Sequence, residues 1–180
     1  MDVLCTVAAA AVRAEPADDA ERVTELLQGE PVAVEERRAG WARIRTVYDY
    51  PGWVREEDLA GIDGDAIEQA RRYLGTPYLW GGMTERGIDC SGLVHMSYRW
   101  LGRLVPRDAD QQEAVGTFVE ESDLQRGDLI TYGSETATHI AFWLGEGRIL
   151  HSTEREGVDG VIEEIEPDNL RGQRRRLIRL

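Results

Sequence analysis

The sequence predicts an α+β protein in two parts, a small β-barrel followed by helices packed on an antiparallel sheet. In the first sixty residues, short β-rich runs alternate with closely spaced turn signals, a pattern typical of a small barrel. Apolar residues then recur at helical spacing over residues 66–74 and 93–101. Strand-like runs follow, among them residues 129–132, 140–144 and 149–152. We place the two domains at residues 1–60 and 64–180.

Alternating runs identify the strands of the first part. Hydrophobic and polar residues alternate around Val32–Val34 and across Trp41–Thr46. Turn-forming clusters separate such runs at residues 15–19, 28–31, 39–40 and 50–52. We expect Trp41 and Trp53 to lie in the core of this barrel rather than exposed for stacking on a ligand.

A helix is predicted to open the second part, after a linker at residues 60–64. Its apolar positions are Ala66, Ile67, Ala70, Tyr73 and Leu74. Either Asp63 or Asp65 can cap its first turn, and Gly75 suits its end. Thr76–Pro77 then directs the chain out of helical geometry.

The charge balance excludes some classes of partner. The chain of 180 residues carries a formal net charge of −13, which argues against a nucleic-acid partner because phosphate binding needs a positive face. No apolar stretch approaches the ~20 residues of a membrane span. The apolar run at residues 3–12 lacks the basic flank of a secretory leader, so we expect a cytoplasmic protein without membrane contact. The basic cluster Arg171–Arg179 is interpreted as a solvated edge strand.

Two cysteines have different surroundings in the sequence. Cys5 lies in an Ala-rich apolar run and is interpreted as a small buried hydrophobe. Cys90 directly precedes the second helical pattern, where first-turn N–H groups and the helix dipole favour a thiolate. The same N–H groups could stabilise an oxyanion. From this position alone, a nucleophile and an inert buried cysteine are equally compatible with Cys90.

The placement of the three histidines favours the nucleophile. His95 lies five residues after Cys90 on the same helix, which turns it away from the site. His139 opens one strand-like run, and His151 lies in the next, after a turn at Glu146–Gly147. A hairpin would bring both rings to one end of a sheet, His139 as general base and His151 as its orienter. The wide spacing argues against a zinc site, and we expect no metal.

A series of short motifs spans this region. It comprises Thr76–Gly82, Asp89–Val94, Pro106–Asp108, Gln112, Gly127–Ile130, Thr138–Ala141 and Leu150–Ser152. In order and spacing these motifs resemble the NlpC/P60 family of cell-wall peptidases. The resemblance implies a papain-like fold with a triad of Cys90, His139 and His151 and no cofactor. It also implies hydrolysis of the γ-D-glutamyl to diamino-acid bond (Lys or diaminopimelate) in peptidoglycan stem peptides.

The first part resembles a bacterial SH3 domain. The signatures are Val12–Pro16, Gly29–Val32, Gly40–Ile44 and Gly52–Val54. This domain order resembles the γ-D-glutamyl-L-diamino acid endopeptidases of cell-wall recycling, which implies free peptides with an N-terminal L-Ala as substrates.

The resemblance also implies residues that contact the substrate. Asp89 and Ser91 would hold its amino terminus, and Tyr50 would be the aromatic contributed by the SH3-like domain. An N-acylated substrate would then leave Asp89 buried and unpaired. Trp80 is expected to contribute to the substrate site while packing behind the cleft. Arg107 is interpreted as the partner of Asp108 in a structural ion pair.

Three alternative functions are compatible with the same sequence. One is a secreted endopeptidase that cuts intact cell wall, with the SH3-like domain as an anchor. Another is a catalytically silent protein that binds wall peptides, although the presence of Cys90, His139 and His151 argues against it. The third is an acyltransferase on the same fold, which would prefer an amine acceptor to water. The sequence predicts no oligomeric state.

Overall fold

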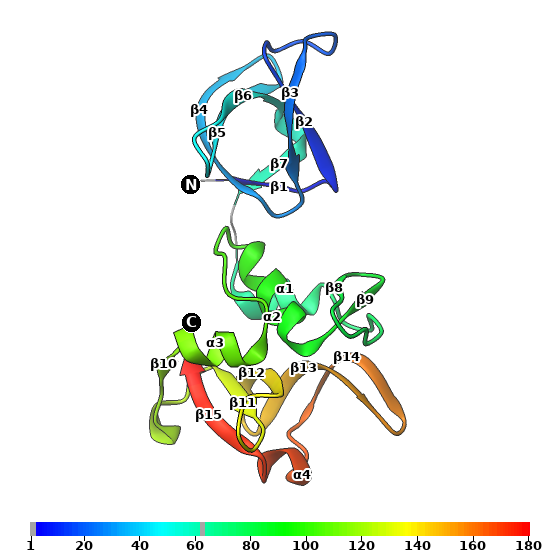
Figure 1. Ribbon diagram of the computed structural model, residues 1–180, viewed down its shortest axis with the longest axis vertical. Helices are drawn as coiled ribbons and strands as arrows, with labels where there is room; N and C mark the ends of the chain where they lie inside the picture. Colours follow the sequence, from blue (N-terminus) through cyan, green and yellow to red (C-terminus); the bar gives the residue numbers. More distant parts are fainter. Residues whose placement is uncertain (1–2, 62–63) are drawn as a thin grey trace. The chain divides into compact units, whose positions relative to one another are not determined.

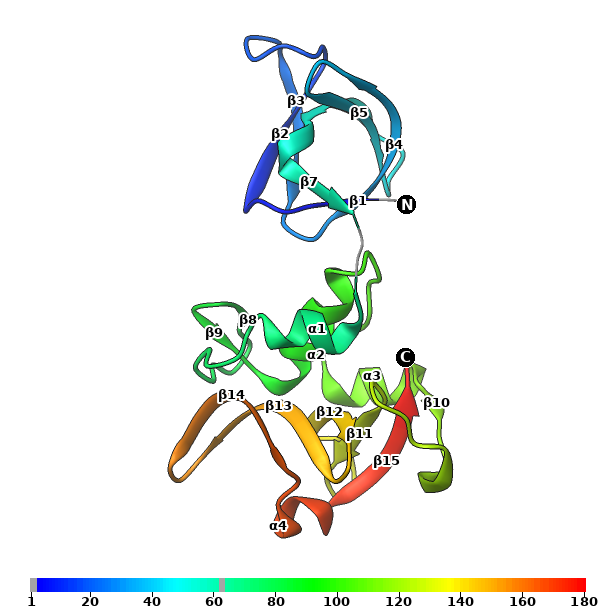
Figure 2. The ribbon, with the colours of Figure 1, turned by 180° about the vertical axis from the view of Figure 1, so that it is seen from behind.

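A computed structural model describes residues 3–61 and 64–180 (Figures 1 and 2). The chain forms two compact units. One comprises Met1–Gly64 with Arg99–Arg103, and the other comprises Asp65–Tyr98 with Leu104–Leu180. The predicted linker at residues 60–64 includes residues 62 and 63, which lie outside the described residues.

The first unit is a strongly curved antiparallel sheet that curls into the predicted small barrel (Figure 1). Its strands are β1 (Val3–Cys5), β2 (Ala9–Arg13), β3 (Arg22–Leu27), β4 (Pro31–Arg38), β5 (Trp41–Thr46), β6 (Pro51–Arg55) and β7 (Leu59–Gly61), with a 3-10 turn at Glu56–Asp58. They are ordered β3-β2-β6-β5-β4-β1-β7. Ala39 and Gly40 join β4 to β5, and both have positive φ, the geometry of a tight hairpin turn.

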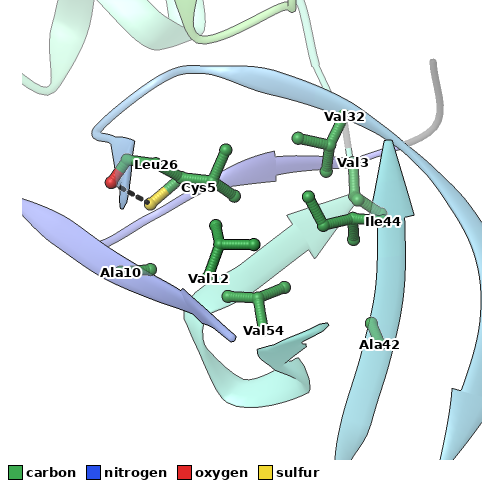
Figure 3. Close-up of a cluster of buried hydrophobic side chains, with 9 residues drawn as sticks. All are labelled: Val3, Cys5, Ala10, Val12, Leu26, Val32, Ala42, Ile44 and Val54. Atoms are coloured by element: carbon green, nitrogen blue, oxygen red, sulfur yellow. Dashed lines mark hydrogen bonds between the residues drawn. The ribbon is translucent and has the colours of Figure 1, made fainter. Parts of the chain in front are cut away.

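Small aliphatic side chains fill the centre of this barrel (Figure 3). Cys5 is fully buried among them with its thiol facing the Leu26 carbonyl, so its interpretation as a small hydrophobe is confirmed. Trp41 and Trp53 are also buried, as predicted.

The second unit packs helices on a six-stranded antiparallel sheet. Its helices are α1 (Ala66–Arg71), α2 (Cys90–Arg99), α3 (Ala109–Val115) and α4 (Asp168–Arg171). The sheet contains β10 (Thr117–Phe118), β15 (Arg174–Arg179), β11 (Leu129–Tyr132), β12 (His139–Gly145), β13 (Arg148–Arg155) and β14 (Val158–Ile165), in that order. A small ribbon of β8 (Met83–Thr84) and β9 (Gly87–Ile88) precedes α2, and a 3-10 turn lies at Glu121–Asp123. Within the described residues, no helix is long and apolar enough to span a membrane.

Both ends of the predicted first helix have identifiable signals. Asp65 caps α1, because its side chain accepts a hydrogen bond from the Glu68 N–H while the Glu68 carboxylate accepts one from the Asp65 N–H. Asp63, the other predicted cap, lies outside the described residues. Regular α-helix ends at Arg71, earlier than predicted, and turns continue to Gly75 at φ 80°.

The predicted histidine hairpin is confirmed. β12 and β13 pair antiparallel, with Phe142 opposite Leu150. Glu146 and Gly147 form the turn between them, and both have positive φ. His139 therefore starts one strand, and His151 lies in the middle of its neighbour.

The interpretation of the basic cluster as a solvated edge strand is wrong. β15 lies inside the sheet, between β10 and β11. Its arginines pair with buried carboxylates from other elements, Arg174 with Glu166, Arg175 with Glu113 and Arg179 with Asp128. Charge alone suggested a solvated strand, because Glu113 and Asp128, the partners of Arg175 and Arg179, are distant in sequence.

Glu166 offers a test of how much these pairs stabilise the domain. Its carboxylate is fully buried and accepts hydrogen bonds from Arg174 and Tyr132. We expect Glu166→Ala to lower the free energy of unfolding by about 3 kcal/mol, because it removes the buried acceptor that Arg174, Arg171 and Tyr132 share. Urea unfolding would measure the loss.

Glu121 is the matched control because it pairs with the same Arg174 at 3.0 Å, from a side chain that is 80% exposed. Glu121→Ala should cost less than about 1 kcal/mol. Equal losses in the two variants would contradict the importance of the buried pair.

Candidate active site

Cys90 is the first residue of α2, and it lines a pocket of about 540 Å³. The thiol-bearing residue is only 5% exposed. Two side chains fix the backbone around it. Asp89 Oδ1 accepts a hydrogen bond from the Gly92 N–H at 2.7 Å, which caps the helix, and Gln112 Nε2 donates to the Ser91 carbonyl at 3.0 Å. The structure therefore presents a cysteine at a helix N-terminus, as the sequence predicted.

The electrostatic surroundings of Cys90 differ from the prediction. Burial raises the pKa of its thiol to about 11, and the nearby Asp89 carboxylate acts in the same direction. The N–H groups of Ile140, Ser91 and Cys90 itself lower the pKa, but burial outweighs them. The resting group is a neutral thiol, so attack requires a base that removes its proton.

His139 and His151 lie in direct contact. His139 Nε2 is 2.8 Å from His151 Nδ1, and the two rings meet nearly at right angles. The ring of Tyr132 packs on His139 with centroids 5.6 Å apart. Because the Ile140 N–H faces the Cys90 sulfur, the residue next to His139 is already at the nucleophile. The hairpin thus brings the two histidines together and places Ile140, the neighbour of His139, at Cys90.

Sequence reasoning missed Glu164 and Arg155. His151 Nε2 is 2.9 Å from Glu164 Oε1, and Arg155 donates to both oxygens of the same carboxylate, at 2.8 and 2.6 Å. Both residues belong to the β13–β14 hairpin, which turns at Glu156–Gly157. That turn signal, shortly after His151, could have predicted a returning strand with a carboxylate near the ring.

Burial keeps both histidines neutral. It lowers the pKa of His139 to about 3, and the neighbouring His151 acts in the same direction. Burial also lowers the pKa of His151, although the hydrogen bond to Glu164 opposes that shift. For Glu164, burial opposes ionisation, but hydrogen bonds from Arg155 and His151 prevail and lower its pKa. The charged groups that act on the two histidine rings are Glu164 and Arg155.

These shifts predict how stability depends on pH. The unfolded histidines bind protons below about pH 6.5, whereas the folded ones resist protonation. Their contribution to stability is thus complete above that pH and is lost as the pH falls, by up to ~1.4 kcal/mol per pH unit for each ring. His139→Gln should therefore flatten the decline of the unfolding free energy between pH 6.5 and 4.5.

The control for this measurement is His95→Gln. His95 lies outside the pocket, with its Nδ1 2.8 Å from the Val105 carbonyl oxygen, as its predicted orientation away from the site requires. This variant removes a histidine elsewhere in the same unit, so the slope of the His139 variant is compared with it directly. A His139 variant with an unchanged slope would show that burial does not hold that ring neutral.

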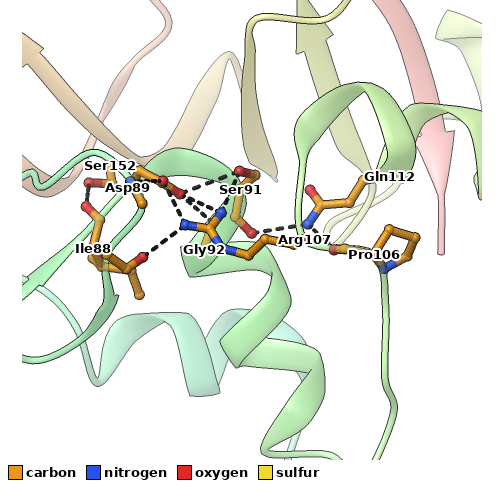
Figure 4. A network of polar contacts seen from close by, with 10 residues as sticks. Ile88, Asp89, Ser91, Gly92, Pro106, Arg107, Gln112 and Ser152 are labelled. Carbon is orange, nitrogen blue, oxygen red and sulfur yellow. Dashed lines mark hydrogen bonds and ion pairs between the residues drawn. The ribbon is translucent and has the colours of Figure 1, made fainter.

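Asp89 has a different partner from the one expected (Figure 4). Arg107 donates hydrogen bonds to this carboxylate from both terminal nitrogens, at 2.9 and 2.7 Å. The interpretation of Arg107 as the ion-pair partner of Asp108 is therefore wrong. The N–H groups of Gly81 and Gly92 each donate to the carboxylate at 2.7 Å. Although burial opposes ionisation, these partners lower the pKa of Asp89. An N-acylated substrate would therefore not leave Asp89 unpaired.

The other predicted contacts lie in two places. Ser91 lines the pocket and accepts a hydrogen bond from Arg107 at 2.9 Å. Trp80 also lines it, but the residue is 81% exposed, so the expectation that it packs behind the cleft is wrong. Tyr50 belongs to the barrel unit, where it lines a separate pocket with Trp53.

Among residues 3–61 and 64–180, no three His, Cys, Asp or Glu side chains are grouped to hold a metal ion.

A cysteine at a helix start, combined with a histidine pair on an antiparallel sheet, is the arrangement of the papain-like class of thiol peptidases. Residues 75–173 match the model of the NlpC/P60 family, and the chain belongs to this family of cysteine peptidases. Residues 12–59 match the bacterial dipeptidyl-peptidase SH3 domain.

Known relatives agree with this assignment. The chain is 38% identical over 96 residues to a gamma-D-glutamyl-L-lysine dipeptidyl-peptidase of Bacillus cereus, a match that covers 51% of this chain and 29% of the relative. The chain thus spans less than a third of that protein.

Solved structures show the same fold. An NlpC/P60 family protein of Bacillus cereus has a TM-score of 0.66 at 24% identity, covering 99% of this chain and 62% of that one. RipD of Mycobacterium tuberculosis, described as a non-catalytic NlpC/P60 protein adapted to peptidoglycan binding, has a TM-score of 0.55 at 28% identity. That match covers 64% of this chain and 94% of RipD.

Proposed function

We propose that this protein is a cysteine endopeptidase that hydrolyses the γ-D-glutamyl to diamino-acid bond of peptidoglycan stem peptides. The observation that carries the proposal is the contact of His139 with His151 at 2.8 Å, beside a pocket lined by Cys90. The name of the Bacillus cereus relative supports this bond as the target. Its preferred substrates would be free peptides with an N-terminal L-Ala.

The proposed first step is attack by Cys90 on the γ-glutamyl carbonyl. Since the resting thiol and imidazole are both neutral, His139 takes the proton as the sulfur–carbon bond forms. N–H groups at the start of α2 stabilise the oxyanion. His139 then protonates the leaving amine, and a water molecule activated by the same ring releases the acyl product.

The pocket lining suggests how the substrate is held. Arg107 and Asp89 form a bidentate pair at the pocket wall, with Ser91 hydrogen-bonded to the guanidinium. We place the amino terminus of the substrate near Asp89 and Ser91, where the carboxylate shares its charge between the substrate ammonium and Arg107. Trp80 at the rim offers an exposed aromatic face to the peptide. The role of Tyr50 stays a prediction.

Cleavage of two matched peptides tests this function. One is free L-Ala-γ-D-Glu-diaminopimelate, and the other is the same peptide N-acylated; a lysine version of each identifies the third residue. We expect cleavage of the free peptide alone, measured by mass spectrometry. Cys90→Ala should lower kcat by roughly 10⁴-fold or more while leaving the unfolding transition in place.

Other outcomes point to the alternatives. Equal cleavage of both peptides would indicate a hydrolase of intact wall. Transfer of the acyl group to an added amine would indicate an acyltransferase. Cleavage of neither peptide, with Cys90 reduced, would contradict the proposal and favour a peptide-binding role like that described for RipD.

Trp80 provides a test of the substrate contact. Trp80→Ala should raise KM about 3- to 10-fold with little change in kcat, because a lost aromatic contact weakens binding by ~1 kcal/mol. Phe118→Ala is the control, since Phe118 is 59% exposed and does not line the pocket. Steady-state kinetics on the preferred peptide would separate the two, and an unchanged KM for Trp80→Ala would remove Trp80 from the substrate site.

A further inference from the structure

The hydrogen-bonded chain at the active site continues beyond the two histidines. It runs from His139 to His151, from His151 to Glu164, and from Glu164 to Arg155. We propose that Glu164, held by Arg155, is a positioning residue that fixes the tautomers of both histidines and so leaves His139 Nδ1 free to act as the base. This inference rests on the proposed function and adds to it a residue that determines which nitrogen reacts.

The direction of the chain follows from the chemistry of each group. An ionised carboxylate can only accept hydrogen bonds, so His151 Nε2 must carry its proton toward Glu164. Because His151 is neutral, its Nδ1 is then a lone pair, which accepts from His139 Nε2 at 2.8 Å. His139 in turn has its lone pair on Nδ1. The Glu164 carboxylate, at the far end of the chain, thereby determines the tautomer of both histidines.

Arg155 keeps Glu164 suited to this role. Its two nitrogens hold both carboxylate oxygens, and Oε1 accepts from Arg155 and His151 at once. This clamp fixes the rotation of the carboxylate and favours its ionised form. The positive charge of Arg155 also offsets the negative charge of Glu164. The carboxylate therefore does not draw a second proton onto His151. Glu164 therefore orients the rings without changing their charge.

The proton balance of the reaction leaves Glu164 unchanged. The Cys90 sulfur loses its proton to His139 Nδ1 as the bond to the carbonyl carbon forms. The same proton passes to the leaving amine when the carbon–nitrogen bond breaks. Neither His151 nor Glu164 gains or loses a proton, so their part is to hold the correct tautomer throughout.

The position of Glu164 predicts which kinetic constant it affects. Neither Glu164 nor Arg155 lines the pocket beside Cys90. We expect Glu164→Ala to lower kcat roughly 10- to 100-fold, as loss of an orienting hydrogen-bond partner commonly does, with KM unchanged. Glu164→Gln keeps an acceptor oxygen where Oε1 lies, so it should retain much more of the activity.

Glu163 supplies a closely matched control. It is the adjacent residue of β14, its side chain is 19% exposed against 20% for Glu164, and it also pairs with two arginines, Arg71 and Arg148. Glu163→Ala removes a similar carboxylate without touching a histidine and should leave kcat within about twofold. An equal loss in both variants would mean that Glu164 matters only for folding.

Two measurements test the tautomers without any peptide substrate. Nitrogen-15 NMR of the full chain labelled at histidine reports which ring nitrogen carries the proton, and His95 serves as the internal reference among only three histidines. We expect both active-site rings to be protonated at Nε2, and Glu164→Ala to give His151 a mixed population. The rate of Cys90 alkylation by iodoacetamide at pH 7 should fall about tenfold in the same variant.

These readouts distinguish the two proposals. If no stem peptide is cleaved but Glu164→Ala changes the tautomers and the alkylation rate, the positioning role stands and the proposed function fails. If peptides are cleaved while Glu164→Ala keeps the tautomers, alkylation rate and kcat of the unmodified protein, the positioning role is refuted.

Discussion

The low polarity around Cys90 and its two histidines determines what the rest of the second unit must supply. Burial raises the pKa of the thiol to about 11 and lowers the pKa of His139 to about 3, so neither group is charged at rest. A pair of this kind cannot rely on a preformed thiolate. It needs a base with the correct nitrogen free, and in the proposed mechanism that base is His139, which the hairpin of β12 and β13 holds against His151.

Buried and half-buried carboxylates are matched with arginine throughout this unit. Asp89, Glu164, Glu166, Glu113 and Asp128 each have a guanidinium partner. The planar fork of arginine reaches both oxygens of a carboxylate, which a lysine ammonium cannot do with the same geometry. All 21 basic residues of the chain are arginine, which suits this use. The result is a negatively charged protein in which these interior acids are paired.

Local pattern predicted much of this architecture. The barrel, the Asp65 cap, the helix after Cys90 and the histidine hairpin all follow from periodicities and turn residues within short windows. The errors share one cause. The partners of Asp89 and Arg175, the exposure of Trp80 and the raised pKa of Cys90 depend on residues far away in the sequence. No local period encodes such long-range pairing or the depth at which a side chain is buried.

The neutral resting state of Cys90 also bears on how long the site survives. Peroxides and other oxidants attack thiolates far faster than thiols, and the sulfenic acid that forms can proceed to irreversible products. A cysteine that is 5% exposed and protonated at neutral pH presents little of the vulnerable form. In the proposed mechanism, the sulfur becomes nucleophilic only when His139 removes its proton during attack. We therefore expect burial to make this cysteine durable under oxidising conditions, independently of its proposed part in peptide hydrolysis.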